Sequence, residues 1–365
     1  MKKVAFVANS EWYLDNFRKS TIEYFLSKHV QVFCLYPKNG DGELSDLGVR
    51  HVKFTMSPAG TSLYFELFSF ICVFLSILRV RPDVLFSFNP KTNLYSLICC
   101  WVLRVKCVVN VSGLGAASQL SGIKGFFYRQ LSSFFYRKAS YIFFQNSDDY
   151  HQLNKAGVIK VGAADVIPGS GVDLNRFHPV ARPEAETTFL MAARLITQKG
   201  VYEYVEAAKN LNGECCSFLL AGVPDSSERA VDANFIKNLD GSEGVKFLGH
   251  VRDMPSLLTK VDCVVLPSYY PEGIPKVLIE ALSSGKIIIT TNTPGCRETV
   301  DDEVNGYLVS PRCSASLATA MLKVCRLGEK DKKEMMNRSR RLAEEKYDEN
   351  IVIGKYWRLF EVLSD

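Results

Sequence analysis

The sequence predicts an α/β protein that contains two doubly wound parallel sheets, one after the other along the chain. Short apolar runs alternate with longer amphipathic segments, which is typical of parallel sheets covered by helices. The alternation is interrupted once, by the polar stretch Arg182–Thr188, and then begins again. A chain of 365 residues also exceeds the size of one ordinary hydrophobic core, so we expect two domains.

Both domains are expected to be Rossmann-like. We place the first at residues 1–175 and the second at residues 176–346. The final amphipathic segment, residues 347–365, is expected to pack back on the first domain.

The strands of the first domain are expected in its short apolar runs, because strands of a parallel sheet are buried on both faces. These runs are Val4–Ala8, Val30–Tyr36, Val49–Phe54, Asp83–Phe88, Lys106–Val111, Tyr141–Gln145 and Asp165–Pro168. Apolar residues at helical spacing in Phe17–Ser27 predict a helix that returns over the first strand.

The same pattern repeats in the second domain. Its strands are expected at Phe189–Ala193, Phe218–Gly222, Val245–Leu248, Val261–Leu266, Ile287–Thr290 and Tyr307–Val309. Helical spacing of apolar residues predicts helices at Val201–Leu211, Ala315–Val324, Lys332–Glu345 and Asn350–Leu363.

The composition limits the classes of function. A hydrophobic content of 47% with 23% charged residues indicates a globular protein. The net charge of +5 fits an anionic ligand or membrane surface, and we expect no nucleic-acid partner. Eleven cysteines without a Cys-x-x-Cys pair predict buried, reduced thiols and neither a disulfide framework nor a zinc site. The apolar run after Met1-Lys2-Lys3 is too short for a signal peptide and is expected to form the first strand.

Two segments of the first domain leave a choice between core and membrane surface. Ser62–Val80 is almost entirely apolar, with Glu66 inside it, and fits either a core helix or a helix resting on a bilayer. Ile123–Lys138 interleaves Lys and Arg with Phe and Tyr, which fits interfacial membrane binding or a core helix with snorkelling basic residues.

The most informative stretch is the strand, loop and helix that begins at Val261. Glu272 lies on the loop, and Pro275 suits the first position of the helix that follows. Glu280 lies on the second turn and leans back toward that loop. The backbone amides at this helix end suit a phosphate; they belong to Gly273, Ile274, Lys276 and Val277. Two isolated glutamates would be surface charge, but this context predicts a nucleotide-sugar pocket.

These residues resemble the retaining glycosyltransferases of family 4, which have the GT-B fold. Glu272 and Glu280 match that family's glutamate pair, and Ala193-Arg194-Leu195 with Gln198-Lys199-Gly200 resembles its phosphate clamp. Further similar blocks are Gly169–Asp173, in which Ser170 replaces a common Asn, Thr293–Glu298 and Asn305–Val309. Three other blocks resemble bacterial enzymes that extend a sugar on polyprenyl diphosphate, including α-1,3-N-acetylgalactosaminyltransferases: Asn89–Tyr95, Asn110–Gly115 and Tyr136–Asp149.

The resemblance implies transfer of a sugar from a nucleotide-sugar donor to a polyprenyl-diphosphate-linked saccharide. The sugar would be GalNAc, GlcNAc or Gal from a UDP-sugar, transferred with retention during O-antigen, capsule or other glycan assembly. The implied catalytic residues are Arg194, Lys199 and Glu272. Implied donor-binding residues are these three with Gly249, His250, Val251, Gly273, Ile274, Pro275, Lys276, Val277 and Glu280. Implied acceptor residues are Asn16, Arg18, Asn89, Lys91, Gly113 and Gly115.

The implied enzyme needs no metal and no cofactor, because D-x-D and metal-ligand clusters are missing from the sequence. It would work in the bacterial cytoplasm, peripherally bound to the inner face of the cytoplasmic membrane. Many relatives have a His in the first domain, where this chain has Phe88-Asn89-Pro90-Lys91, so that role is vacant or changed.

Two other functions remain open on the sequence. A nucleotide-sugar epimerase would need acid and base side chains that the motifs do not supply. A nucleotide-sugar-binding protein without catalysis would have little reason to keep Arg194, Lys199, Glu272 and Glu280 together. A dinucleotide oxidoreductase is disfavoured, because no G-x-G-x-x-G follows the first strand.

Overall fold

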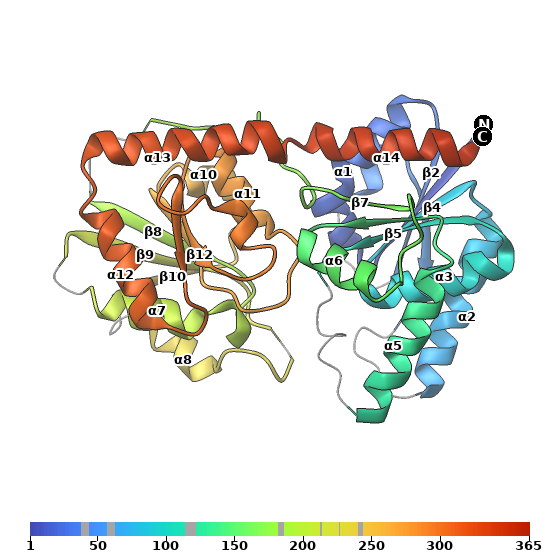
Figure 1. Cartoon of the computed structure of the whole chain (residues 1–365), viewed down its shortest axis with the longest axis horizontal. Coiled ribbons are helices and arrows are strands. Elements are labelled where there is room, and N and C mark those ends of the chain that lie inside the picture. Colours follow the sequence, from blue (N-terminus) through green and yellow to red (C-terminus); the bar gives the residue numbers. More distant parts are fainter. Residues whose placement is uncertain are drawn as a thin grey trace. The chain divides into compact units, whose positions relative to one another are not determined.

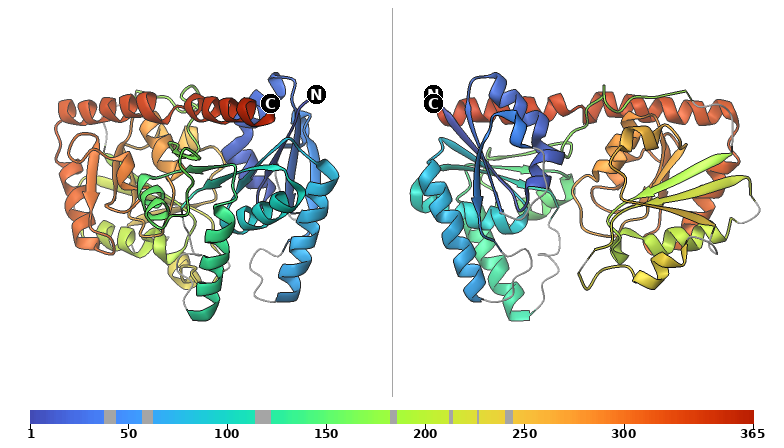
Figure 2. Two further views of the ribbon diagram at one scale, coloured as in Figure 1. Left: turned by 45° about the vertical axis from the view of Figure 1, so that its right-hand side comes forward. Right: turned by 180° about the vertical axis from the view of Figure 1, so that it is seen from behind.

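The chain forms two compact units, shown in a computed structural model (Figures 1 and 2). The first unit contains Met1–Ser170 and Glu349–Asp365, and the second contains Gly171–Asp348. The structure describes residues 1–37, 44–56, 63–113, 122–181, 186–211, 214–225, 227–239 and 244–365.

The first unit is built on a seven-stranded sheet in the order β3-β2-β1-β4-β5-β6-β7. All of its neighbouring strands are parallel, as the sequence predicts. The strands are β1 (Lys3–Val7), β2 (Gln31–Pro37), β3 (Arg50–Phe54), β4 (Val84–Phe88), β5 (Lys106–Val111), β6 (Tyr141–Phe144) and β7 (Ala164–Val166). Their carboxyl ends therefore meet at one edge of the sheet.

Helices cover both faces of this sheet, because the side chains of each strand alternate between the faces. On one face, Val4 and Phe6 pack with α1 (Glu11–Ser27) and α14 (Glu349–Ser364). On the other, Ala5 and Val7 belong to the core that includes α2 (Leu63–Val80), α3 (Pro90–Leu103) and α5 (Gly122–Tyr136). Both figures show α2 and α5 projecting beyond the sheet in the same direction. The unit also contains α6 (Ser147–Lys155).

The second unit is built on a six-stranded parallel sheet in the order β10-β9-β8-β11-β12-β13. Its strands are β8 (Thr187–Ala192), β9 (Cys216–Ala221), β10 (Val245–Gly249), β11 (Cys263–Leu266), β12 (Ile287–Thr291) and β13 (Gly306–Val309). Its helices are α7 (Val201–Lys209), α8 (Ala233–Lys237), α10 (Met254–Leu258), α11 (Lys276–Ser283), α12 (Ser314–Cys325) and α13 (Glu329–Leu342). A π-helical turn, Ala343–Tyr347, follows α13 and precedes α14.

The structure departs from the sequence-based expectations in several details. Helix α1 begins earlier than predicted, at Glu11, because the Ser10 hydroxyl accepts a hydrogen bond from the Tyr13 amide at 3.2 Å. Helices α8 and α10 were not predicted, since five residues are too few to show helical periodicity. The longer helices α3 and α6 were not predicted either. The prediction that the cysteines are buried is wrong for Cys215, which is exposed. None of the helices in the described part of the chain combines the length and the hydropathy that crossing a membrane requires.

Candidate functional site

Three loops at the carboxyl edge of the second sheet are packed tightly together through glycines. Gly295, which follows β12, has a φ of 80°, and a Cβ there would lie 1.6 Å from the Gly273 carbonyl oxygen. Gly200, which follows β8, has a φ of 84°, and a Cβ there would lie 2.4 Å from the Pro267 carbonyl oxygen. Only glycine permits both the backbone conformation and the contact. The loops after β8, β11 and β12 therefore hold one another in place.

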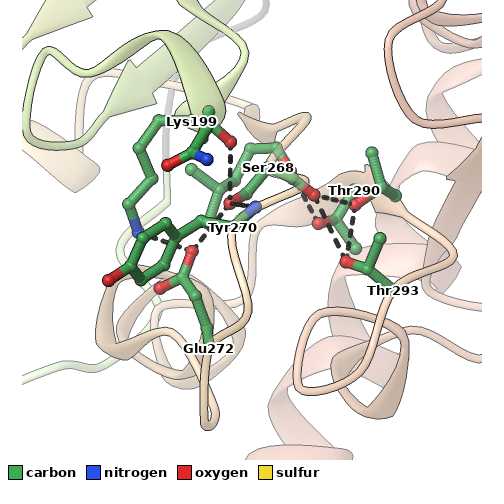
Figure 3. Close-up of polar contacts among 9 residues, drawn as sticks. Lys199, Ser268, Tyr270, Glu272, Thr290 and Thr293 are labelled. Atoms are coloured by element: carbon green, nitrogen blue, oxygen red, sulfur yellow. Dashed lines mark hydrogen bonds and ion pairs between the residues drawn. The ribbon is translucent and has the colours of Figure 1, made fainter. Parts of the chain in front are cut away.

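Lys199 and Glu272 meet in this group of loops, although they are far apart in the sequence. Lys199 Nζ lies 2.5 Å from Glu272 Oε1, and the Ser268 hydroxyl donates to the same oxygen at 2.7 Å (Figure 3). Both side chains are largely withdrawn from solvent, with exposed fractions of 11% for Lys199 and 14% for Glu272. The Tyr270 ring lies beside the ammonium, 5.9 Å from Nζ to the ring centre. The ion pair is therefore held from two sides.

Threonines at the end of β12 fix the segment that carries Ser268. Thr290 donates its hydroxyl to the Leu266 carbonyl at 2.7 Å, and Thr293 donates to the Ser268 carbonyl at 3.2 Å (Figure 3). Thr291 also donates to the Ser268 carbonyl. Ser268 and these threonines were not singled out from the sequence, because hydroxyl side chains near strand ends are common and carry no distinctive spacing.

Glu280 occupies the second turn of α11 and is buried. Burial raises the pKa of its carboxyl group to about 7, and the nearby charges of Lys276 and Arg176 oppose that rise. Pro275 is the N-cap of α11, so the helix begins at Lys276, one residue later than predicted. Because helical side chains lean toward the N-terminus, Glu280 leans toward the Glu272 loop. A buried carboxylate of this kind is suited to accept hydrogen bonds from ligand hydroxyl groups.

Arg194 directly follows β8 and is much less constrained than Lys199. Its side chain is 58% exposed, and Nη1 lies 3.5 Å from Asp225 Oδ2. The pKa of Asp225 is below its ordinary value, first because of the Ser227 hydroxyl and then because of the amide of Ser227 and the charge of Arg194. The guanidinium is thus at the edge of the sheet and able to turn toward an anion.

The other predicted donor residues also belong to this carboxyl edge. Gly249 ends β10, with a φ of 63° and a carbonyl that accepts from the Gly222 amide at 2.8 Å. Residues that follow strands or open α11 are His250, Val251, Gly273, Ile274, Lys276 and Val277. Parallel pairing of all six strands brings the loops after β8, β10 and β11 to one edge.

The predicted acceptor residues in the first unit have varied surroundings. Asn16 is exposed and donates to the Trp12 carbonyl at 2.9 Å. Lys91 Nζ forms an ion pair with Glu66 Oε1 at 2.6 Å, which accounts for the charge inside the apolar helix α2. Asn89 has a φ of 73°, rare for a side-chain-bearing residue, and its Oδ1 accepts from the Asn9 amide at 3.2 Å.

The remaining acceptor predictions concern Arg18 and two glycines. Arg18 is buried in α1, with its guanidinium 4.7 Å from the Phe88 ring centre and 5.4 Å from that of Tyr356. Gly113 follows β5, is buried and has a φ of 93°. Gly115 lies outside the described residues.

Two family models match the chain, one in each half. The model described as Glycosyl transferases group 1 matches residues 175–342. The model described as Glycosyl transferase 4-like domain matches residues 27–168. Together the matches include every donor-binding residue predicted above.

Two bacterial glycosyltransferases are similar to the chain over much of their length. The N,N'-diacetylbacillosaminyl-diphospho-undecaprenol alpha-1,3-N-acetylgalactosaminyltransferase of Campylobacter jejuni is 26% identical, over 98% of both chains. The UDP-Gal:alpha-D-GlcNAc-diphosphoundecaprenol alpha-1,3-galactosyltransferase of Escherichia coli is 25% identical, over 72% of this chain and 71% of its own. The solved structure of Anabaena HepE with UDP-glucose is 18% identical, with a TM-score of 0.79 over 99% of this chain and 100% of that one. This likeness confirms the predicted fold class.

Proposed function

Because the chain belongs to the group 1 glycosyltransferases, we propose that it moves a sugar from a UDP-sugar to a saccharide carried on polyprenyl diphosphate, with retention of the anomeric configuration. The sugar is GalNAc, GlcNAc or Gal. The observation that carries the donor half of this proposal is the cluster of Lys199, Glu272 and Ser268 at the carboxyl edge of the second sheet. Ligands of open α/β sheets bind at this edge.

The cluster offers each part of a UDP-sugar a chemically suitable partner. Lys199 and the exposed Arg194 would neutralise the diphosphate, together with the first amides of α11. Glu272 would accept hydrogen bonds from hydroxyls of the transferred sugar, and Glu280 from those of the ribose. Lys199 would then bridge the diphosphate and the Glu272 carboxylate that it already contacts.

In the proposed reaction, the bond between the anomeric carbon and the diphosphate oxygen breaks, and its electron pair leaves with UDP. An acceptor hydroxyl forms the new bond on the same face of the sugar, and its proton passes to the leaving phosphate oxygen. Negative charge therefore grows on the diphosphate in the transition state. Preorganised cations and amides there contribute most to the rate.

The choice of acceptor is supported by the relatives. The names of the Campylobacter jejuni and Escherichia coli relatives describe transfer to a sugar on diphosphoundecaprenol. We propose the same chemical class for this chain, within bacterial surface-polysaccharide or glycan assembly. Such an acceptor is anchored in a bilayer, so the enzyme must work at a membrane surface.

The first unit has a surface suited to that task. Large apolar side chains of α2, α3 and α5 are exposed, and these helices cover the same face of the sheet. The exposed side chains are Tyr64, Phe65, Leu67, Phe68, Ile71, Leu75, Leu78, Trp101, Val102, Phe126, Leu131 and Phe134. Arg129 is exposed on α5, and Lys138 Nζ lies 5.3 Å from the Phe134 ring centre. Aromatic and basic residues together are typical of interfacial binding to anionic lipid.

Vesicle flotation tests the membrane proposal. Replacing Phe65, Phe68, Phe126 and Phe134 by Ser removes apolar contact area and should abolish binding to vesicles that contain anionic lipid. Phe135 is left unchanged, because it is buried against the core and contacts Trp101 at 5.9 Å between ring centres. Val304→Ser, an exposed valine of the second unit, is the matched control. Equal flotation of the fourfold variant and the wild type would exclude this surface.

Release of UDP tests the reaction itself. The purified protein would receive each UDP-sugar in turn, with a short-chain GlcNAc-diphosphate-lipid as acceptor, EDTA present and Glu272→Ala in parallel. We expect acceptor-dependent release with one sugar, lost in the variant. Turnover without acceptor that yields an altered sugar would instead identify an epimerase. Tight UDP-sugar binding without any turnover would identify a binding protein.

A further inference from the structure

The charge of Arg18 is unusual among the buried cations of the described residues. Its exposed fraction is 1%, and none of its three guanidinium nitrogens has a hydrogen-bond partner among those residues. A guanidinium cannot lose its proton to escape this situation. Buried unpaired donors of this kind are rare and call for a partner outside the chain, either water or an ion.

The surroundings of Arg18 hold the guanidinium in place without neutralising it. The ring of Phe88, the last residue of β4, lies on it at 4.7 Å, and the ring of Tyr356 in α14 lies at 5.4 Å. These two rings are themselves stacked, with centres 6.4 Å apart. Asp15, one turn earlier in α1, makes no ion pair with Arg18 within the described chain, and its own buried Oδ1 also lacks a partner there. Aromatic faces attract a cation but cannot accept its N–H groups in the plane of the guanidinium.

A hydrogen-bond acceptor in need of a donor completes the group. Asn110 pairs in register with Phe88 across β4 and β5, and its amide nitrogen donates to the Tyr356 hydroxyl. Its Oδ1 is buried and lacks a partner among the described residues. Arg18 therefore has cationic donors, and Asn110 a neutral acceptor, that lack hydrogen-bond partners among the described residues. A phosphoryl group next to a sugar hydroxyl would satisfy both.

The group also lies near the working edge of the first sheet. Phe88 and Asn110 are at the carboxyl ends of their strands, and α1 begins at Glu11, directly after β1. Since helical side chains lean toward the N-terminus, Arg18 leans toward this edge. Asn89, the next residue after Phe88, has its strained φ of 73° there, and backbone strain tends to gather at binding sites.

We propose that Arg18 binds a phosphoryl group of the acceptor's diphosphate, held for that purpose between Phe88 and Tyr356. Asn110 accepts a hydrogen bond from the adjoining sugar. The inference rests on the proposed transfer to a diphosphate-linked acceptor and adds the C-terminal helix, through Tyr356, to the acceptor site. Water would satisfy the nitrogens of Arg18, whereas an anion also neutralises its charge.

Calorimetric binding of inorganic pyrophosphate and decyl diphosphate, with UDP at saturation to occupy the donor site, tests this assignment. Arg18→Met keeps the apolar stem and removes the charge, and we expect at least tenfold weaker binding of both probes. Lys19→Met removes an exposed cation from the same helix and should stay within twofold of the wild type. Retained affinity in Arg18→Met would overturn the proposal. If Arg18→Met weakens the binding of decyl diphosphate alone, Arg18 binds the lipid-linked diphosphate rather than free pyrophosphate, and the proposal stands.

Stability without ligand gives an independent check, because a structural arginine and a ligand-binding arginine predict opposite results. Removing a buried, unpaired charge should leave the unfolding temperature equal or higher. A fall of several degrees in Arg18→Met would show a structural role and overturn the assignment. Affinity for UDP should be equal in all variants. Failure of the wild type to bind UDP would count against the proposed function alone, while the two diphosphate probes still report on Arg18.

Discussion

The two units differ in how they hold charge. In the second unit, Lys199 and Glu272 are paired and further held by Ser268. In the first unit, the guanidinium of the buried Arg18 has no hydrogen-bond or ion-pair partner among the described residues, and α2 and α5 expose large apolar side chains. The second unit thus has a polar cluster in which opposite charges are paired, whereas the first has a buried charge without an ion-pair partner among the described residues and exposed apolar side chains.

This difference follows the chemistry of the two proposed substrates. Every UDP-sugar presents the same diphosphate and ribose, so one arrangement of cations, amides and carboxylates suits them all. The acceptor varies in its sugar and is carried by a lipid, so its site needs an anion-binding group and a membrane surface. Variants of each unit should therefore have separate effects.

The largest effect is expected from Lys199→Ala in the second unit. Loss of its charge from the leaving diphosphate should lower kcat/KM by a factor of about 10²–10³, or about 3–4 kcal/mol of transition-state stabilisation. Steady-state UDP release measures it. Lys246→Ala, which removes an exposed lysine on β10, should stay within twofold of the wild type. A loss below tenfold for Lys199→Ala would separate this residue from the chemistry.

A smaller but structural effect is expected from Gly295→Ala. Its Cβ would lie 1.6 Å from the Gly273 carbonyl oxygen, so the free energy of unfolding of the second unit should fall by about 3 kcal/mol. Gly249→Ala has the same sign of φ but no atom within 4 Å of the added Cβ, and should cost about 1 kcal/mol.

The three tryptophans, Trp12, Trp101 and Trp357, all lie in the first unit, so their fluorescence follows that unit alone. Circular dichroism follows both units. If the units unfold separately, Gly295→Ala shifts only the transition that fluorescence does not follow. An equal shift in both signals would show that the two units unfold together, so that neither has a stability of its own.

The smallest effect concerns the pH dependence of the second unit. The pKa of Glu280 is raised to about 7 in the folded chain, so the folded state binds this proton more tightly than the unfolded state does. The contribution to stability is therefore full below about pH 4.5 and is lost as the pH rises to about 7. Between pH 5.5 and 8, Glu280→Gln should gain about 2 kcal/mol relative to the wild type.

Denaturant midpoints from circular dichroism at the two pH values measure this gain. Glu345→Gln, an exposed glutamate of the π-helical turn, is the matched control and should show no such difference. A Glu280→Gln variant that follows the wild type at both pH values would mean that the carboxyl group titrates normally.

Much of the fold was predictable, because buried parallel strands are short apolar runs. Lys106–Val111 matches β5 at both ends, and the other predicted strands lie within a few residues of those observed. Helices α8 and α10 were missed because five residues are too few to show helical periodicity, and the longer helices α3 and α6 were missed as well. The first turns of α1 were missed because the predicted helix was placed only where apolar residues recur at helical spacing, and the N-cap Ser10 lies before that region.

The candidate sites were predictable to different degrees. Glu272 and Lys199 could be named from local blocks, but their contact arises only when the loops after β8 and β11 meet. Arg18 could be named, yet its burial, its missing partner and its contact with Tyr356 depend on α14 packing beside α1. No local pattern joins residues so distant in the sequence.

In the proposed function, the second unit binds the donor and the first unit binds the acceptor. This division of roles can be measured by two-substrate steady-state kinetics of Lys199→Ala and Arg18→Met, side by side with the wild type. We expect Lys199→Ala to alter kcat and the KM for UDP-sugar, and Arg18→Met to raise only the KM for the diphosphate acceptor. Both variants changing the same constant by the same factor would contradict it.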